Sequence, residues 1–260
     1  MNVFIVYAHP EPRSLNGSLE RFMVEHLERQ GHVVQVSNLY AMRWKSHLDT
    51  DDFPARSPDA RLHADRDSRH AYEGGTQTAD VVAEQQKLLW ADVVILQFPL
   101  WWYAMPAILK GWVDRVFACG FAYGVGEHSD KRWGDRFGEG VMVGKRAMLV
   151  VTAGGWSPHY GPRGINGPME DLLFPIHHGI LFYPGFTVLP PFVVYRTDKI
   201  DDARFTQTTE ALGRRLDTLA TTPPIAYRMQ NGGDYEIPAM TLRPHLAPDR
   251  EGFGVHVDER

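Results

Sequence analysis

Apolar and polar positions alternate in blocks along most of this chain. Compact apolar runs predict five buried strands, at residues 3–8, 33–36, 92–98, 146–152 and 186–195. Apolar residues at helical spacing predict five helices, over 15–30, 78–89, 106–119, 169–182 and 201–219. Strands that alternate with helices in this way are typical of an α/β protein with a doubly wound parallel sheet and helices on both faces.

Several residues mark where these elements begin, end or bend. Ser14 suits the N-cap of the first helix, and Gly31 suits its C-terminal end. Pro175 predicts a break in the fourth helix. Pro190 and Pro191 lack a backbone N–H group, which predicts an edge position or a bulge in the fifth strand.

Three segments lack a regular pattern. Residues 41–76 are polar, and a connection of this length is often functional. Residues 120–144 carry six further glycines after Gly120, a composition that suits a mobile flap. From Thr221 onward the chain is rich in Pro and Gly. We therefore expect one domain over residues 1–220 and an irregular C-terminal arm over residues 221–260.

Composition and charge narrow the possible partners and compartments. The chain has 260 residues, is 43% hydrophobic and carries a formal net charge of −5, which argues against nucleic acid as a partner. Its single cysteine, Cys119, excludes a disulfide within the chain and suits a reducing cytoplasm. The run at residues 3–8 is too short for a signal sequence, and no apolar run approaches the ~20 residues of a membrane span.

The stretch 97–112 carries the strongest chemical signal. A buried strand ends in proline, three consecutive aromatic residues follow, and a helical pattern then begins. Trp101, Trp102 and Tyr103 cannot all face one core in either a strand or a helix. Ligands of open α/β sheets bind at the carboxyl edge of the strands, so residues 99–103, here called the aromatic shelf, predict a flat surface for a planar aromatic ligand.

The loop after the first strand distinguishes two nucleotide-binding folds. A dinucleotide-binding sheet would carry G-x-G-x-x-G there, but the first glycine after that strand is Gly17. Instead, His9, Ser14 and Asn16 stand before a helix N-terminus, where backbone N–H groups and hydroxyls can hold a phosphate. This pattern favours the flavodoxin-like fold, with five parallel strands in the order 2-1-3-4-5 and a flavin at their carboxyl edge.

Several motifs match one family in order and spacing. They are Ala8-His9-Pro10-Glu11, Ser14-Leu15-Asn16, residues 97–112, Phe121-Ala122-Tyr123, Gly154-Gly155 with Tyr160, and Gly179-Ile180-Leu181. With them, the chain resembles the NAD(P)H:quinone oxidoreductase (DT-diaphorase) family and its bacterial flavodoxin-like relatives, from residue 3 to about residue 219. Residues 1–220 would then be the flavin-binding catalytic domain.

The resemblance implies a homodimer with FAD at two interfacial sites. NAD(P)H would give a hydride to the flavin and leave, and a quinone would then take the hydride in a ping-pong reaction. The residues implied for the cofactor are His9, Ser14, Leu15, Asn16, Pro99, Leu100, Trp101, Trp102, Tyr103, Thr152, Ala153, Gly154, Gly155, Tyr160 and Arg204. Tyr123 and Tyr183 match substrate-pocket aromatics that a partner subunit contributes. Trp102 of the shelf would bind the substrate from the chain's own side.

The catalytic candidates lie beyond the fourth strand. Gly155 can bring its backbone N–H close to a reduced flavin because it has no Cβ, and the Tyr160 hydroxyl is a further donor. Mammalian family members carry a histidine six residues after this tyrosine, whereas this chain carries Asn166. Asparagine does not titrate near neutral pH, so we expect Asn166 to act only as a hydrogen-bond donor.

Other clusters have simpler interpretations. His177 and His178 are adjacent, so their rings diverge by about 100° on a helix and suit packing better than a shared metal. The charged residues around His63 and His70 suit a solvated loop, and Cys119 suits an inert buried thiol. We expect no metal site.

Three alternatives stay open at this point. The acceptor could be an azo dye or a nitroaromatic compound, and the flavin could be FMN. The chain could also be a regulatory flavoprotein subunit of a potassium-efflux system, because such ancillary proteins share the fold.

Overall fold

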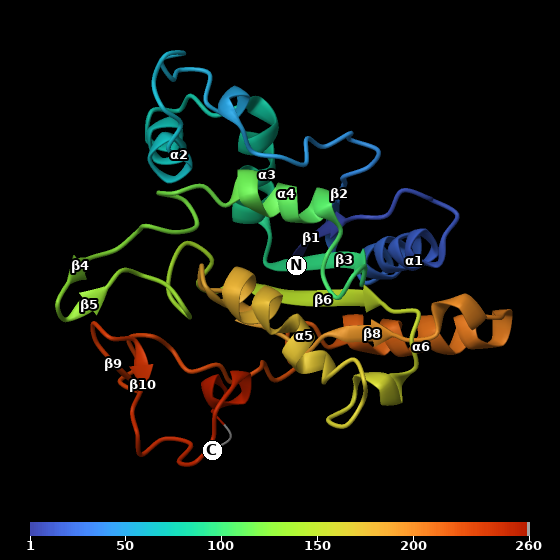
Figure 1. The fold of residues 1–260 in the computed structure, drawn as a ribbon. Helices are drawn as coiled ribbons and strands as arrows, with labels where there is room; N and C mark the ends of the chain where they lie inside the picture. The colour runs from blue at the N-terminus through green and yellow to red at the C-terminus, as the bar shows by residue number, and fades with distance from the viewer. Residues whose placement is uncertain (259–260) are drawn as a thin grey trace.

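A parallel sheet runs through the middle of the protein in the computed structural model, which describes residues 1–258 (Figure 1). Its strands are β1 (Asn2–Tyr7), β2 (Val33–Asn38), β3 (Val93–Pro99), β6 (Arg146–Thr152), β7 (Thr187–Val188) and β8 (Phe192–Val194). The order is β2-β1-β3-β6, with β7 and β8 both paired to β6, and every pairing is parallel. The predicted order 2-1-3-4-5 is confirmed.

The fifth position of the sheet is split into two short strands. Leu189 still donates its N–H to the Ala147 carbonyl at 2.8 Å, but Pro190 and Pro191 have no N–H to donate. Pairing with β6 resumes only at β8. The interruption that the two prolines predict in this strand is therefore confirmed.

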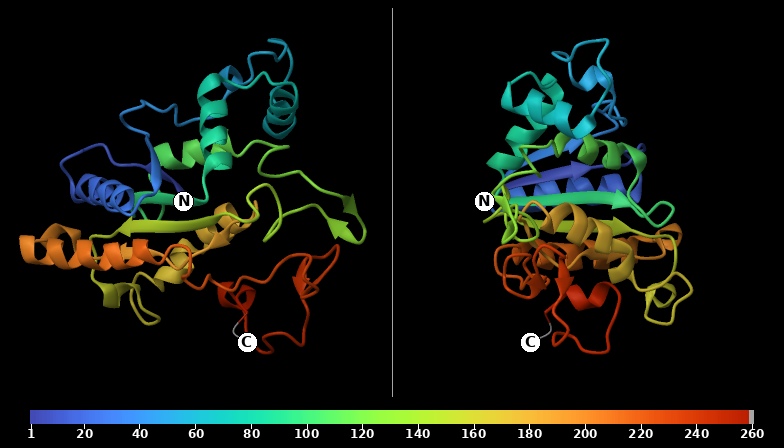
Figure 2. Two further views of the ribbon diagram at one scale, coloured as in Figure 1. Left: turned by 180° about the vertical axis from the view of Figure 1, so that it is seen from behind. Right: turned by 60° about the vertical axis from the view of Figure 1, so that its left-hand side comes forward.

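Six α-helices surround the sheet. They are α1 (Leu15–Arg29), α2 (Ala64–Glu73), α3 (Ala79–Trp90), α4 (Ala107–Val116), α5 (Met169–Ile176) and α6 (Asp202–Asp217), counted over residues 1–258. Short helical turns are η1 (Thr50–Asp52), η2 (Ser157–Tyr160), η4 (Thr197–Lys199) and η5 (Phe253–His256), and a π-helix, η3 (His177–Phe182), continues α5. Further views show α1 and α6 together on one side of the sheet (Figure 2).

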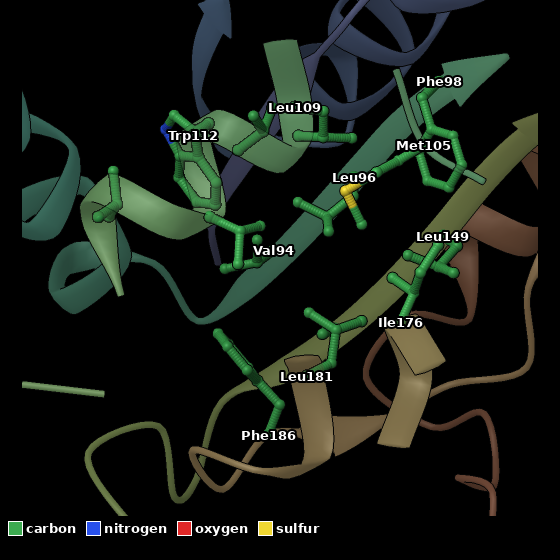
Figure 3. Close-up of a cluster of buried hydrophobic side chains, with 14 of the residues drawn as sticks. Val94, Leu96, Phe98, Met105, Leu109, Trp112, Leu149, Ile176, Leu181 and Phe186 are labelled. Carbon is green, nitrogen blue, oxygen red and sulfur yellow. The ribbon is translucent and has the colours of Figure 1, made fainter. Parts of the chain in front are cut away.

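The alternation of side chains along each strand builds two cores. On β1, Val3 and Ile5 pack with α1 and α6, whereas Phe4 and Val6 pack with α3 and α4. On the second face, side chains of β3 and β6 meet those of α4, α5 and η3 (Figure 3). Every residue of β3 is buried, so the strand that leads into the aromatic shelf is fixed on both faces.

The charged residues around His63 and His70 do not form the solvated loop that was predicted for them, because they build α2. The segment 41–76 contains η1 and α2, and it docks on α4 through a buried ion pair between Asp52 and Arg115 at 2.6 Å. Gly111 of α4 permits this approach, since a Cβ there would lie 2.1 Å from the Ser46 carbonyl oxygen. The expectation was wrong because polar contacts, rather than an apolar stripe, hold this segment.

Two hairpins extend from the sheet on the same side. The glycine-rich segment 120–144 forms β4 (His128–Ser129) and β5 (Arg132–Trp133), and the arm forms β9 (Tyr235–Glu236) and β10 (Thr241–Leu242). They lie side by side in Figures 1 and 2, and the Gln230 side-chain amide donates to the Trp133 and Gly134 carbonyls. The mobility expected of this segment stays a prediction.

The helix predicted over 169–182 changes character after Pro175. The α-helix α5 ends at Ile176 and the chain continues as the π-helix η3. A proline cannot donate to the preceding turn, so a change of helical pattern here has a direct cause. At this junction His177 is only 2% exposed, and its Nε2 has no hydrogen-bond partner within residues 1–258.

The buried His177 predicts acid sensitivity. Burial lowers the pKa of His177 from 6.5 to about 4. Because the unfolded chain binds this proton first, stability is unaffected above about pH 6.5 and falls as the pH drops toward 4. We expect His177 to lower the free energy of unfolding by about 2 kcal/mol between pH 7 and pH 5. Denaturant unfolding of wild type and His177→Asn at both pH values measures this change in the free energy of unfolding.

The exposed His245 supplies the matched control. His245→Asn should keep the wild-type loss of stability on acidification, whereas His177→Asn should lose about 2 kcal/mol less. Equal losses in the wild type and His177→Asn would show that this histidine does not couple folding to protons.

Candidate functional site

The turn between β1 and α1 is organised around His9. The Glu11 N–H donates to His9 Nδ1 at 3.1 Å, and Ser14 Oγ lies 3.0 Å from the same nitrogen. A neutral imidazole that accepts at Nδ1 carries its proton on Nε2, which is left as a donor. Ser14 Oγ also accepts from the Gly17 N–H at 3.2 Å and so caps α1 as predicted, with Leu15 as the first helical residue.

Asn16 ties the first turn of α1 to the ends of β3 and β6. Its side-chain amide donates to Thr152 Oγ1 at 2.8 Å, and its carbonyl accepts from Gln97 Nε2 at 2.7 Å. All three residues are buried. The side chain predicted to hold a pyrophosphate is therefore engaged with β6, and its contact with a phosphate stays a prediction.

The aromatic shelf ends in a tight turn. Trp101 and Ala104 exchange two backbone hydrogen bonds, at 3.1 and 3.0 Å, around Trp102 and Tyr103. Both central residues have left-handed backbone, with φ of 50° and 61°. Residues other than glycine rarely adopt this backbone conformation, and such backbone strain is typical of functional sites. As a result Trp102 is 94% exposed and Tyr103 52% exposed, so neither lies in the core.

The shelf and the His9 turn are neighbours. The rings of Trp101 and His9 have centroids 5.9 Å apart. Pro99 is buried at the end of β3, and Leu100 donates its N–H to the Thr152 carbonyl at 2.8 Å. The structure thus brings the ends of β1, β3 and β6 into one continuous edge.

The two glycines after β6 differ in their surroundings. A Cβ on Gly154 would meet no atom within 4 Å, whereas a Cβ on Gly155 would lie 2.9 Å from the Tyr160 ring. Gly155 therefore lets Tyr160 close over the loop, and Gly154 leaves its side of the edge open. Thr152 and Ala153 are buried just before them.

Asn166 reaches the aromatic shelf from a different loop. The Tyr103 hydroxyl donates to Asn166 Oδ1 at 3.0 Å. This bond joins residues 63 positions apart, and no sequence pattern predicts it. With Oδ1 engaged, the Nδ2 group of Asn166 is left as a donor, as the sequence interpretation requires.

Tyr123 and Tyr183 lie together but away from the shelf. Both line a cavity of about 670 Å³ that includes Phe117 and Ile180, and no shelf residue lines it. Burial raises the pKa of the Tyr123 hydroxyl. These two residues therefore do not complete the site of their own chain.

Arg204 supports a loop at the far end of the site. Its guanidinium donates to the carbonyls of Tyr195 and Arg196, at 2.5 and 2.9 Å. It also lines a cavity of about 570 Å³ with Trp156 and Arg196. The Arg196 guanidinium lies 4.1 Å from the Trp156 ring centroid, a pair that sequence reasoning did not identify because the two residues are far apart in the chain.

Within residues 1–258, no helix is long and apolar enough to cross a membrane. The same residues hold no group of three or more His, Cys, Asp or Glu side chains placed to bind a metal ion.

The sheet is parallel in this order, a turn that caps the N-terminus of α1 follows β1, and the aromatic shelf follows β3. These features define a flavodoxin-like protein. Residues 1–216 match the model of a family described by the flavodoxin-like fold, and the chain belongs to this family.

Three relatives are particularly informative. A Klebsiella pneumoniae crystal structure described as a candidate quinone reductase is 64% identical, with a TM-score of 0.98, and the match covers 99% of this chain and 100% of that one. A ribosyldihydronicotinamide dehydrogenase-like protein of Penicillium crustosum is 58% identical over 98% of this chain and 95% of its own. The NAD(P)H dehydrogenase (quinone) 1 of Rattus norvegicus is 37% identical over 86% of this chain and 79% of its own.

Proposed function

We propose that this chain is an NAD(P)H:quinone oxidoreductase that uses a flavin and transfers two electrons as a hydride. One observation carries the proposal: the His9 turn, the aromatic shelf and the open Gly154 share one edge of the sheet. The names of the quinone reductases and dehydrogenases similar to this chain support it.

The residues at this edge fit a flavin. The exposed rings of Trp102 and Tyr103 offer a flat apolar wall, and the space beside Gly154 admits a ligand close to the backbone. Ser14 and the first turn of α1 suit a phosphate. When bound, the flavin supplies the redox chemistry, taking a hydride from a reduced nicotinamide and giving it to a quinone in alternation.

The chain's own residues orient the cofactor and stabilise charge. The N–H groups of Gly154 and Gly155 suit the pyrimidine side of the ring, where negative charge develops on reduction. The Tyr160 hydroxyl and the Asn166 Nδ2 group are further donors at the same edge. Because these groups are held by the fold before the reaction begins, they need little reorganisation during it.

We assign FAD rather than FMN to the site. The cavity that contains Trp156, Arg196 and Arg204 adjoins the glycine loop, since the Arg196 N–H donates to the Gly155 carbonyl at 3.0 Å. This cavity of about 570 Å³ offers room for the adenosine half of FAD. Mass spectrometry of the flavin released by denaturation tests the assignment, and FMN would overturn it.

The separate position of Tyr123 and Tyr183 supports a homodimer. Each chain would lend these tyrosines to the site of its partner, where they would contact a flat substrate beside Trp102. Light scattering should give a mass of two chains.

The buried, unpaired Cys119 is consistent with our expectation of a reducing cytoplasm.

Absorbance spectra test the proposal most directly. The purified protein should show flavin bands that bleach with NADH or NADPH under anaerobic conditions and return on addition of a simple quinone. Protein that stays colourless with every flavin offered would overturn it. Parallel assays with dihydronicotinamide riboside, and with azo and nitroaromatic acceptors, would define the donor and the acceptor.

Asn166 should influence the rate and its pH dependence. Asn166→Asp places a negative charge where charge develops, and we expect flavin reduction about tenfold slower at pH 7. Asn166→His introduces a group that titrates near pH 6.5, so the rate should gain a pH dependence in that range. Anaerobic stopped-flow measurements from pH 5.5 to 8.5 record both effects.

Tyr103→Phe is the control, because it removes the hydrogen bond to Asn166 and keeps the aromatic ring. We expect a change below about threefold and an unaltered pH profile. If neither Asn166 variant changes the rate or the profile, Asn166 has no role in charge stabilisation.

A further inference from the structure

A small cavity lies between the glycine-rich segment 120–144 and the C-terminal arm. Its volume is about 140 Å³, and its walls come from both segments and from η3. The β4–β5 hairpin of the first segment and the β9–β10 hairpin of the arm approach each other in Figures 1 and 2. The cavity shares no lining residue with the aromatic shelf or with the Tyr123 cavity, so the flavin chemistry proposed above does not account for it.

Flat rings form half of the cavity wall, since four of its eight lining residues carry one. The His178 ring stacks on Phe137 with centroids 4.7 Å apart, and the His256 ring stacks on Tyr235 at 6.0 Å. Burial lowers the pKa of His178 to about 4, so its imidazole is neutral at pH 7. A cavity of about 150 Å³ with apolar walls is known to hold one benzene molecule. The size and the walls therefore suit a single planar ring.

The two charged residues that line the cavity are both arginines. Arg228 is already engaged, with Asp234 at 2.7 Å, Asp258 at 3.5 Å and the Val255 carbonyl at 3.2 Å. Arg136 is held differently, because only its Nε donates, to Gln230 Oε1 at 2.5 Å. Within residues 1–258 its terminal nitrogens donate no hydrogen bond, and its guanidinium carbon lies 5.8 Å from the ring centroids of both Phe137 and Tyr183.

A guanidinium with two unused nitrogens matches the geometry of a carboxylate. We propose that this cavity binds a small aromatic carboxylate with one six-membered ring, whose carboxylate pairs with the terminal nitrogens of Arg136. The aromatic walls hold the ring, and Arg136 supplies the selectivity for an anion. Because three segments line the cavity, the ligand also fixes the arm against the glycine-rich segment.

Benzoate is the probe for this site. Ligand-observed NMR on the purified full-length protein at pH 7 should detect benzoate binding. Benzamide, which has the same ring and no charge, should bind at least about tenfold more weakly, as should the two-ring 1-naphthoate, which exceeds the cavity. Absence of benzoate binding, or equal binding of benzamide, would overturn the proposal.

Two variants locate the binding. Arg136→Gln should weaken benzoate binding at least about tenfold. Arg132→Gln removes the same charge from the same segment, but Arg132 pairs with Asp135 and Glu139 and does not line the cavity, so binding should stay within about twofold of wild type. Equal binding by wild type and Arg136→Gln would overturn the assignment. Neither the ligand comparison nor the variants require flavin, so their outcome is independent of the proposed function.

Discussion

Replacing Gly154 by valine is expected to weaken flavin binding about 10- to 100-fold while the flavin-free protein keeps its stability. A Cβ at this position would meet no protein atom within 4 Å, and the backbone is not left-handed there. A side chain at this position therefore meets no clash or backbone strain that would destabilise the flavin-free protein. The same open space is what a flavin would fill. Extra methyl groups in an occupied site cost about 1–3 kcal/mol, and 1.4 kcal/mol is a factor of ten in affinity.

Gly155 provides the contrasting variant. A Cβ there would lie 2.9 Å from Tyr160 Cε2, so Gly155→Ala should destabilise the protein even without flavin. Thermal unfolding of flavin-free protein, together with titration of flavin fluorescence, separates the two effects. If Gly154→Val binds flavin as tightly as wild type, this side of the edge does not contact the cofactor.

The sheet could be predicted because each strand is a compact apolar run. Residues 93–99 are buried on both faces, and the alternation of such runs with helices leaves few possible topologies. Helix α2 could not be found in this way. Its buried residues are Asp67, Ser68 and Ala71, and Asp67 accepts the His63 N–H at 2.9 Å. Polar contacts stabilise much of this helix, and Tyr72 is its one large apolar side chain packed on the core, so too few apolar residues mark it in the sequence.

The candidate site could be predicted in its parts but not in its connections. The exposure of Trp102 follows from three consecutive aromatic residues, which cannot share one core. The left-handed turn that exposes it, the Tyr103–Asn166 bond and the Asn16–Thr152 bond depend on loops that meet only in the folded chain. Family resemblance named most of these residues, and physical reasoning from one sequence could not have paired them.

Replacing Glu84 by alanine is expected to lower the free energy of unfolding by about 3–5 kcal/mol. Glu84 is fully buried on α3, and its carboxylate accepts from Lys87 Nζ at 2.6 Å, Ser37 Oγ at 2.9 Å and Trp112 Nε1 at 2.8 Å. Alanine would leave the lysine charge and the buried indole N–H without this acceptor. Urea unfolding followed by tryptophan fluorescence measures the loss.

Glu73→Ala is the matched control, because Glu73 pairs with Arg69 on the exposed surface of α2 and should contribute less than about 1 kcal/mol.

Trp112 ends the 97–112 stretch, yet it packs in the core behind the sheet rather than at the carboxyl edge. Glu84→Ala should therefore leave the flavin affinity of the folded protein within about threefold of wild type, the reverse of Gly154→Val. Equal unfolding midpoints for Glu84→Ala and Glu73→Ala would show that this buried carboxylate is not what fixes α3 and α4 to the sheet.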